Sequence, residues 1–401
     1  MRVELGALLL LLGAPACTDD AGSSSSGATG GSAGRDAGSG GSAGRAGGQN
    51  TGGAAATTTG GASGAAGVGG TAGAAGGSGA GGSGNQGPGD FAMRCKAPGV
   101  VRCVGFDAPQ DISGKSGGPT GITTGAAAPA LDTTVKASGN SSLKFTIPSN
   151  SPADTSGSYW ANFSDDYSVQ FDSGEEFFVQ WRQRFGPDFL TTDYPGGEGW
   201  KQVIIGEGSR PNDPAYSCTT LEVVTVNSYH RGFPEMYHSC GVKDGQYEGF
   251  EQPIPPDDFA LQNAISGCTY HNPMVPPCFG YKPNQWMTFQ VRIKIGTWYR
   301  NDHVYHHDST VQLWVAEEGK PSELVIDMSP GDPQCAARQT SQPPCKTGYD
   351  LVNDAIGTAK YGQVWLLPYN TGKSASASHP ETYTWYDELI VSRNKIADPA
   401  P

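Results

Sequence analysis

The sequence predicts an all-β domain, a two-sheet antiparallel β-sandwich of the jelly-roll type, that follows a disordered N-terminal tether. All of the 8 Trp, 16 Tyr and 14 Phe lie at or after Phe91, so the apolar core must form there. From Val100 onward, short alternating runs are separated by clusters of Gly, Pro, Asn and Asp, which is typical of strands and turns. No convincing amphipathic helix exceeds about three turns, and the pattern therefore favours packed sheets.

Residues 1–17 (MRVELGALLLLLGAPAC) predict an export signal. One Arg precedes an apolar stretch that is too short to span a bilayer as a helix. Ala14–Cys17 resembles the lipobox of bacterial lipoproteins, in which the Cys is lipidated after cleavage. We therefore expect lipidation at Cys17 and a place in the bacterial cell envelope. Plain secretion is the alternative, because Ala stands where the lipobox usually has Leu, and Glu4 weakens the charged region.

Residues 18–90 predict a disordered linker rich in Gly, Ala and Ser. This segment holds 28 of the 59 glycines and no aromatic residue. It therefore cannot bury enough apolar surface to offset the entropy of ordering it. Residues 91–401 are left as the jelly-roll domain.

Charge narrows the class of partner. Residues 91–401 carry 23 Lys and Arg against 34 Asp and Glu, which would repel a phosphate backbone. We expect no nucleic-acid partner, and no membrane contact except through an N-terminal lipid anchor. The absence of an apolar run of about 20 residues excludes a polytopic membrane protein.

Nine cysteines leave an even number once Cys17 is set aside, which suits disulfides in an exported chain. The connectivity does not follow from the sequence, but each close pair brackets a loop rich in Pro, Gly or Asn. No Cys-x-x-Cys occurs, which argues against zinc. The favoured local pairs are Cys95 with Cys103, Cys218 with Cys240, Cys268 with Cys278, and Cys335 with Cys345.

The predicted strands follow one another with long loops between them. A short helix is possible only at Asp257–Ser266 or Asp350–Ile356. The strands are expected at 100–106, 141–148, 158–163, 176–185, 200–206, 219–227, 236–240, 285–295, 310–317, 324–328, 363–367 and 382–391.

Period-two alternation assigns a buried face to several of these strands. Residues 177, 179, 181 and 185 should face the core, with Gln180, Arg182 and Arg184 on the other face. The odd residues from Met287 to Ile295 should also be buried. In the last strand we expect Tyr383, Trp385, Leu389 and Val391 to face inward.

The run Thr382–Ser392 resembles the closing strand of concanavalin A-like jelly rolls, a superfamily that includes secreted polysaccharide lyases and laminarin-type glucanases. Glu176–Phe185, Gly199–Gln202 and Gln285–Ile295 resemble central strands of the lyases of that fold. The resemblance covers most of residues 100–395. It implies the fold, but it leaves the activity open because the fold hosts lectins, hydrolases and lyases.

Lyases of acidic polysaccharides need a cation or amide that neutralises the uronate carboxylate, a base and an acid. These groups could come from two arginines on one strand face, a Lys-Gln pair and two Tyr-His dipeptides. The alternative is that the arginines lie on an ordinary solvated sheet face and that the Tyr-His pairs fix a loop. The candidate catalytic residues are Arg182, Arg184, Lys201, Gln202, Tyr229, His230, Tyr237 and His238.

The family motifs are incomplete. Alginate lyases of this fold carry Arg-x-Glu-x-Arg, whereas Arg182-Gln183-Arg184 lacks the Glu and the spacing. Gln202-Val203-Ile204 has Ile where Gln-Ile/Val-His has His, and Tyr361–Tyr369 has no matching Lys. Of the glucanase pattern Glu-x-Asp-x-x-Glu, only Glu222 remains in Glu222–Asn227.

Further side chains could contact a ligand or a metal. Trp314 and Trp365 should point outward, because their strand neighbours are apolar. Asp165-Asp166 and Asp257-Asp258 could bind structural calcium, although no EF-hand spacing is present. No metal ligand is assigned, and His303, His306 and His307 fit an exposed loop better. The candidate substrate-binding residues are Gln180, Glu222, Asn227, Trp314, Trp365 and Tyr369.

Together these patterns predict an extracytoplasmic, monomeric, polysaccharide-active protein without a certain cofactor. The first hypothesis is a lyase that cleaves an acidic polysaccharide by β-elimination. The alternative is a non-catalytic glycan-binding or cell-surface adhesion module of the same fold, which the incomplete motifs favour.

Overall fold

The structure, a computed structural model, describes part of the chain. Its described residues are 90–114, 118–123, 127–192, 200–211, 214–215, 221–228, 233–238, 260–261, 279–298, 306, 308–330, 351, 358–370, 373, 375–376 and 378–400. The predicted signal, the linker up to residue 89 and the predicted helix near 350–356, except Leu351, lie outside them. No helix in the described ranges is long and apolar enough to cross a membrane.

The described residues form strands, with short helices only. The α-helices are α1 (Phe91–Cys95) and α2 (Pro187–Thr191), and the 3-10 helices are η1 (Pro109–Asp111) and η2 (Ala153–Ser156). The strands are β1 (Val100–Val104), β2 (Thr120–Ile122), β3 (Ala130–Asp132), β4 (Ser142–Ile147), β5 (Tyr159–Asn162), β6 (Glu176–Phe185), β7 (Trp200–Glu207), β8 (Glu222–Ser228), β9 (Phe233–His238), β10 (Ala260–Leu261), β11 (Trp286–Lys294), β12 (Thr310–Ala316), β13 (Glu323–Met328), β14 (Tyr361–Asn370) and β15 (Thr382–Ser392).

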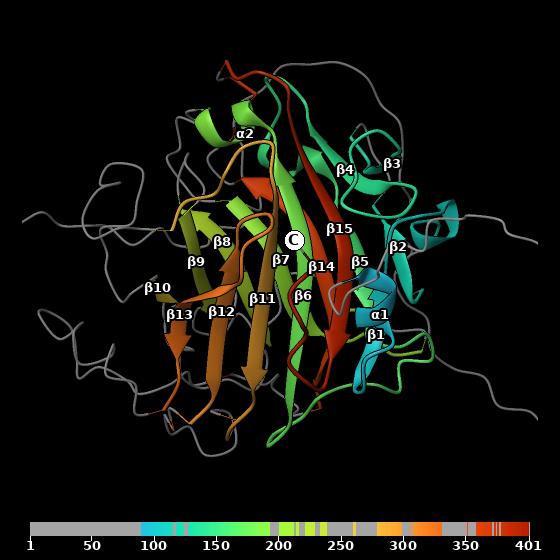
Figure 1. Cartoon of the computed structure of the whole chain (residues 1–401), viewed down its shortest axis with the longest axis vertical. Helices are drawn as coiled ribbons and strands as arrows, with labels where there is room; N and C mark the ends of the chain where they lie inside the picture. The colour runs from blue at the N-terminus through green and yellow to red at the C-terminus, as the bar shows by residue number, and fades with distance from the viewer. Residues whose placement is uncertain are drawn as a thin grey trace, which may run out of the picture. The chain divides into compact units, whose positions relative to one another are not determined.

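Two antiparallel sheets pack face to face, which confirms the predicted sandwich (Figure 1). One is eight-stranded in the order β13-β12-β11-β6-β15-β4-β3, with β1 paired to β15. The other is seven-stranded in the order β10-β9-β8-β7-β14-β5-β2. The chain alternates between sheets from β4 to β7 and again from β14 to β15, as in a jelly roll.

Each predicted strand overlaps an observed one, and the three additional strands β2, β3 and β10 are two or three residues long. The helix expected at Asp257–Ser266 is wrong at its described residues. Ala260 and Leu261 instead pair with Met236 and Glu235 at the edge of the seven-stranded sheet.

The core lies between the sheets, where alternate residues of each central strand meet. Phe177, Val179, Trp181 and Phe185 on β6 are fully buried, as predicted, and so are the odd residues of β11. The Trp181 and Phe289 rings stack with centroids 5.3 Å apart. Aromatic residues bury large apolar areas, so contacts of this kind contribute strongly to the stability of the core.

Polar side chains also cross the core and join the two sheets. Gln202 on β7 donates to Gln183 on β6 at 2.6 Å and accepts from the Tyr281 hydroxyl at 2.9 Å. Gln183 donates in turn to Thr384 on β15 at 2.9 Å. Because buried amides are costly without partners, this network fixes the two sheets relative to each other.

The inward direction predicted for Tyr383 and Trp385 is wrong, although Leu389 and Val391 are buried in the core as predicted. The register of β15 shifts between Asp387 and Ile390, and Glu388 has φ of 51°. An extra residue in a strand reverses the alternation beyond it. Tyr386 therefore lies in the core, and Tyr383 and Trp385 lie on the outer face.

One of the four disulfides predicted from spacing falls within the described residues and is confirmed. The bond between Cys95 and Cys103 ties α1 to β1, with the two Cα atoms 5.7 Å apart. The other three pairs stay predictions, because their six cysteines all lie outside the described residues. These pairs are Cys218 with Cys240, Cys268 with Cys278, and Cys335 with Cys345.

The eight-stranded sheet is partly covered on its outer side. The helix α1 lies there, tied by its disulfide to β1 of the sheet, and the C-terminal segment, residues 393–400, crosses the same face. Ile396 in this segment packs with Phe178 and Ile390. Gln290 bonds both the N–H (2.8 Å) and the C=O (3.2 Å) of Ile396, so the backbone of the segment is held on the sheet.

Replacing Phe289 by Ala should lower the free energy of unfolding by about 3–5 kcal/mol, because it leaves a cavity beside Trp181 and Tyr281. Chemical denaturation of the full chain measures it. Leu324→Ala is the control: Leu324 is 42% exposed and should lose less than about 1 kcal/mol. Equal losses in the two variants would contradict the placement of the core.

Candidate functional site

The predicted catalytic residues divide between the two sheets. Arg182 and Arg184 lie on the outer side of β6 in the eight-stranded sheet, and Lys201 lies on β7 in the seven-stranded sheet. The apolar core separates these outer faces by the sheet spacing of about 10 Å plus the side chains. The predicted set therefore does not converge in one groove.

Lys201 and Gln202, which are adjacent on β7, also point to opposite sides of their sheet. The register of β7 shifts between Lys201 and Val203. Gln202 turns into the core network, where it is 1% exposed, whereas Lys201 is half-buried on the outer face. Gln202 thus joins the sheets and does not face a substrate.

The Tyr237-His238 dipeptide is divided in the same way. His238 is 2% exposed and shares the inward side of β9 with Met236, which belongs to the core. Tyr237 is on the outward side, packed with Ile204 and Val224. Tyr229 and His230 lie outside the described residues.

A row of apolar and aromatic side chains crosses the outer face of the seven-stranded sheet. In register, Tyr237 lies beside Val224, Val224 beside Ile204, Ile204 beside Trp365, and Trp365 beside Trp160. The two Trp rings are 5.5 Å apart and tilted by 40°. Trp160 is 6% exposed and Trp365 is half-buried, so Trp365 offers more of its surface.

Lys201 and Tyr369 lie next to this row. They are register partners on β7 and β14, and the Lys201 ammonium lies 5.3 Å from the centroid of the Tyr369 ring. Both are half-buried. Within the described part of the chain, no carboxylate pairs with Lys201. We call Lys201, Tyr369, Trp365 and Tyr237 the Lys201 face.

Buried polar residues lie at one end of the outer face of the seven-stranded sheet. Gln363 donates to the Ser209 hydroxyl at 3.0 Å, and the Ser209 N–H donates to Asn162 at 2.8 Å. Glu222, a predicted substrate contact, lies opposite Gly206 and is only 1% exposed. Its charge adds to burial in raising the pKa of Tyr361 well above the ordinary value. Asn227 is opposite Trp200 at the other end of β8.

On the eight-stranded sheet, Gln180 and Arg182 contact the segments that cover it. Gln180 accepts from Arg94 of α1 and donates to the Ala397 carbonyl at 3.2 Å. Arg182 lies 3.8 Å from both Glu388 and Glu318, and Arg94 pairs with Glu388. These contacts fix α1 and the C-terminal segment on the sheet, so Gln180 and Arg182 do not line an open groove.

A second group lies further along the outer face of the eight-stranded sheet. Arg184, Trp385 and Lys144 are register neighbours on β6, β15 and β4. The Lys144 ammonium lies 4.0 Å from the Tyr383 ring centroid and 5.8 Å from that of Trp385. The Trp385 indole N–H donates to Asp132 at 2.9 Å. We call Lys144, Arg184, Tyr383 and Trp385 the Lys144 patch.

Trp314 points outward between the buried Leu313 and Val315, as the alternation predicts, and so does Trp365 between Val364 and Leu366. The Lys395 ammonium lies 4.6 Å from the Trp314 ring centroid. Lys395 therefore lies over one face of this ring.

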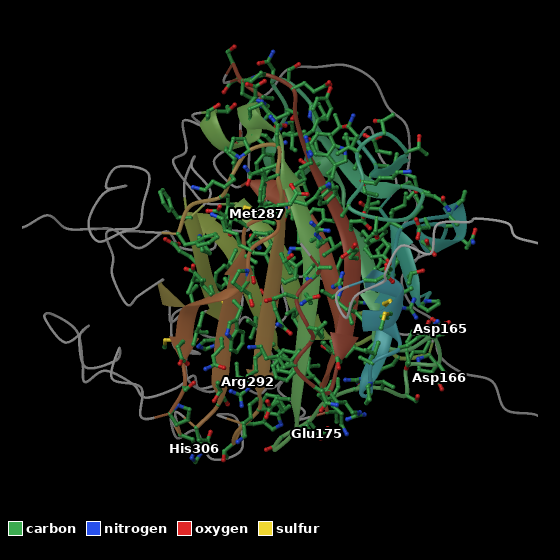
Figure 2. The ribbon with its side chains drawn as sticks, viewed as in Figure 1. Asp165, Asp166, Glu175, Met287, Arg292 and His306 are labelled. Carbon is green, nitrogen blue, oxygen red and sulfur yellow. A yellow bond between two sulfur atoms is a disulfide. The ribbon has the colours of Figure 1, made fainter. Side chains whose placement is uncertain are left out.

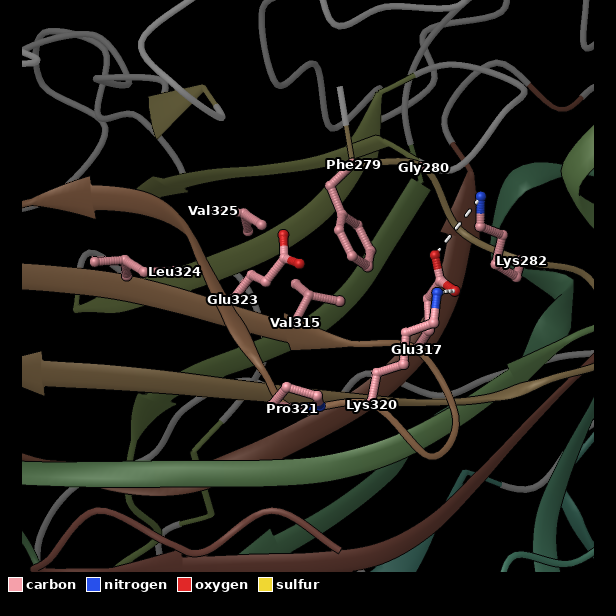
Figure 3. Close-up of a pocket in the computed structure, with 10 residues that line it drawn as sticks. All are labelled: Phe279, Gly280, Lys282, Val315, Glu317, Lys320, Pro321, Glu323, Leu324 and Val325. Atoms are coloured by element: carbon pink, nitrogen blue, oxygen red, sulfur yellow. Dashed lines mark hydrogen bonds and ion pairs between the residues drawn. The ribbon is translucent and has the colours of Figure 1, made fainter. Parts of the chain in front are cut away.

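A pocket of about 270 Å³ opens at the edge of the eight-stranded sheet (Figure 3). Phe279, Val315 and Val325 form its apolar part. Lys282 and Lys320 both approach Glu317 at the rim, and the Lys320 hydrogen bond chiefly holds the pKa of Glu317 below its usual value. None of its lining residues belongs to the Lys201 face.

Asp165 and Asp166, a possible calcium site, are labelled in Figure 2, and both make contacts within the protein. Asp165 pairs with Arg102, and Asp166 accepts from the N–H (3.1 Å) and hydroxyl (2.7 Å) of Ser168. Among the described residues no three His, Cys, Asp or Glu side chains gather as metal ligands. Asp257-Asp258 lies outside them.

No protein-family model and no curated protein matches the chain. Among solved structures, an alginate lyase from Aplysia kurodai matches with a TM-score of 0.42 and 12% identity, over 73% of this chain and 98% of that one. An endo-β-1,4-glucuronan lyase from Trichoderma reesei matches with 0.40 and 13%, over 68% and 89%. An alginate lyase from a Chlorella virus matches with 0.35 and 13%, over 69% and 93%. At these values the fold rests on the strand pairing itself.

Asp132 provides a test of the Lys144 patch. Partial burial raises its pKa, but hydrogen bonds from Thr134, Trp385 and Val135 outweigh this and lower it to about 2. A lowered carboxyl pKa stabilises the fold above the unfolded value of about 4. This stability is lost as the pH falls through about 2.

In denaturation from pH 5 to 2, wild type should therefore lose stability below about pH 4 more steeply than Asp132→Asn. Asp327→Asn is a control on β13 of the same sheet, whose carboxylate accepts hydrogen bonds from Gln312 and Ser329 instead. If Asp132→Asn loses stability below about pH 4 as steeply as wild type, the assigned hydrogen bonds are contradicted.

Proposed function

We propose that the protein binds an acidic polysaccharide on the Lys201 face and cleaves it by β-elimination. The observation that supports this is the Lys201 ammonium, held over the Tyr369 ring without a carboxylate partner in the described residues, next to the half-buried Trp365. A cation without a carboxylate partner beside aromatic rings suits an anionic sugar, and it stands out in a chain with more acidic than basic residues.

The roles follow from the chemistry of elimination. Lys201 would neutralise the uronate carboxylate, which makes the neighbouring C5–H more acidic. A base removes that proton, the electron pair forms the C4–C5 double bond, and the bond from C4 to the leaving oxygen breaks. Tyr369 would carry this proton from C5 to the leaving oxygen, and Trp365 would stack against a sugar ring.

A non-catalytic glycan-binding module is the second candidate. The observation that favours it is the inward direction of His238, which removes the predicted imidazole base from the Lys201 face. Binding requires only the cation and the aromatic rings, whereas elimination also requires Tyr369 to act as the proton carrier.

We also propose that the domain acts outside the cytoplasm, in the bacterial cell envelope, and that lipidation of Cys17 anchors it. The export pattern of residues 1–17 and the Cys95–Cys103 disulfide support this. A linker of this composition would give the domain a reach of roughly 45 Å. Mass spectrometry of the mature N-terminus would detect lipid on Cys17, and an unmodified, unprocessed N-terminus would refute the anchor.

Incubation of the full, oxidised chain with alginate, polygalacturonate or glucuronan should raise ultraviolet absorbance as the unsaturated product forms. Lys201→Gln should lower kcat/KM about 100-fold or more, because it removes the charge that stabilises the developing anion. Tyr369→Phe should lower kcat by about 100-fold if the phenol carries the proton.

Lys294→Gln is the matched control, since Lys294 is an exposed cation at the end of β11 that contacts no aromatic ring among the described residues. Absorbance that stays flat on every substrate, with retention of the protein in gels that contain one of them, would replace the lyase by the binding module. A loss in Lys294→Gln as large as that in Lys201→Gln would contradict the site.

A further inference from the structure

We propose that the Lys144 patch is a second binding site for an acidic polysaccharide, on the sheet opposite the Lys201 face and without a part in catalysis. The class of ligand rests on the proposed function, but the site rests on its own residues. Its four members come from β4, β6 and β15, which lie side by side in the eight-stranded sheet (Figure 1).

The first argument is a pair of open cations in one row. Arg184 and Lys144 are the register neighbours of Trp385 on its two sides. Neither makes an ion pair with the described residues, and the buried Nε of Arg184 has no hydrogen-bond partner among them. By contrast, Arg292 on the same sheet contacts Glu176 at 2.8 Å.

The second argument is that the aromatic rings are held in place. Asp132 accepts the Trp385 indole N–H at 2.9 Å, and Glu381 accepts the Tyr383 hydroxyl. The ring centroids are 6.0 Å apart, with planes at 35°. Tyr383 and Lys144 are half-buried, so both keep surface for a ligand. Because both rings are already held, binding would cost little side-chain conformational entropy, which favours affinity.

The ammonium in this arrangement keeps its hydrogen-bond donors available. A cation–π contact uses the charge of Lys144 but none of its three N–H donors. A uronate carboxylate could accept from Lys144 and Arg184, while its sugar ring lies against Tyr383. A neutral glycan would leave both cations unused, so the patch selects an acidic one.

The Lys144 patch repeats the chemistry of the Lys201 face, with a lysine over a tyrosine ring beside a tryptophan. Two such surfaces on opposite sides of one sandwich would hold a long polymer at two points. A second contact raises avidity for long chains without changing the reaction on short ones.

The test uses the full chain with Tyr369→Phe as the parent, so that the polymer is not cleaved. Its retention is measured by electrophoresis in gels that contain alginate, polygalacturonate or glucuronan, with a neutral glucan as the blank. Adding Lys144→Gln and Arg184→Gln should weaken retention about tenfold, since a surface ion pair contributes up to about fivefold. Adding Lys294→Gln, a change of one charge on the same sheet, should leave it nearly unchanged.

Two further measurements separate this inference from the proposed function. In an otherwise wild-type chain, Lys144→Gln with Arg184→Gln should leave kcat on short oligosaccharides unchanged and raise KM for the polymer. Weakened retention without any cleavage by wild type would support the second site and refute the lyase. Normal cleavage with unchanged retention would overturn the second site and leave the lyase standing.

If Lys294→Gln weakens retention as strongly as the Lys144→Gln and Arg184→Gln pair, the inference is also overturned, because the effect of charge would be non-specific. So would a parent protein that none of the three acidic polymers retains. Circular dichroism of each variant checks the fold. In a chain with Arg184 intact, Lys144→Arg keeps the charge and should restore most of the retention that Lys144→Gln loses.

Discussion

The packing of two apolar inner faces against each other is the constraint on which the rest of the structure depends. Trp181 and Phe289 on one sheet, and Val203 and Val364 on the other, are fully buried in the same core. Since side chains alternate along a strand, burial of one face sends the intervening residues outward except at bulges. The sandwich thus has two separate outer faces, and each of the two proposed sites lies on one of them.

This constraint explains how the same chemistry occurs twice. On each sheet, a lysine lies over a tyrosine ring beside a tryptophan, and on neither does a described carboxylate neutralise it. The two faces differ in what surrounds them. Elsewhere on the eight-stranded sheet, α1 and the C-terminal segment contact Gln180, Arg182 and Gln290, so only part of its outer face remains open.

Sequence alone predicted the strands and most of their buried faces, because period two is a local property. It could not assign strands to sheets, since β6 pairs with β15 from about 200 residues away. The catalytic set predicted from the sequence therefore combined Arg182 and Lys201, which lie on opposite outer faces of the sandwich. The division of Tyr237 from His238 was visible in the alternation of β9, whereas the bulge at Glu388 and the cover over Trp314 depend on tertiary contacts.

The central claim is that an acidic glycan binds where a lysine lies over a tyrosine ring beside a tryptophan. Lysine acetylation of the full chain, with and without a uronate oligosaccharide and read by mass spectrometry, tests it directly. The account predicts slower acetylation of Lys201 and Lys144 in the presence of the sugar and no change at the exposed Lys294. Equal protection at Lys294, or none at Lys201, would contradict it.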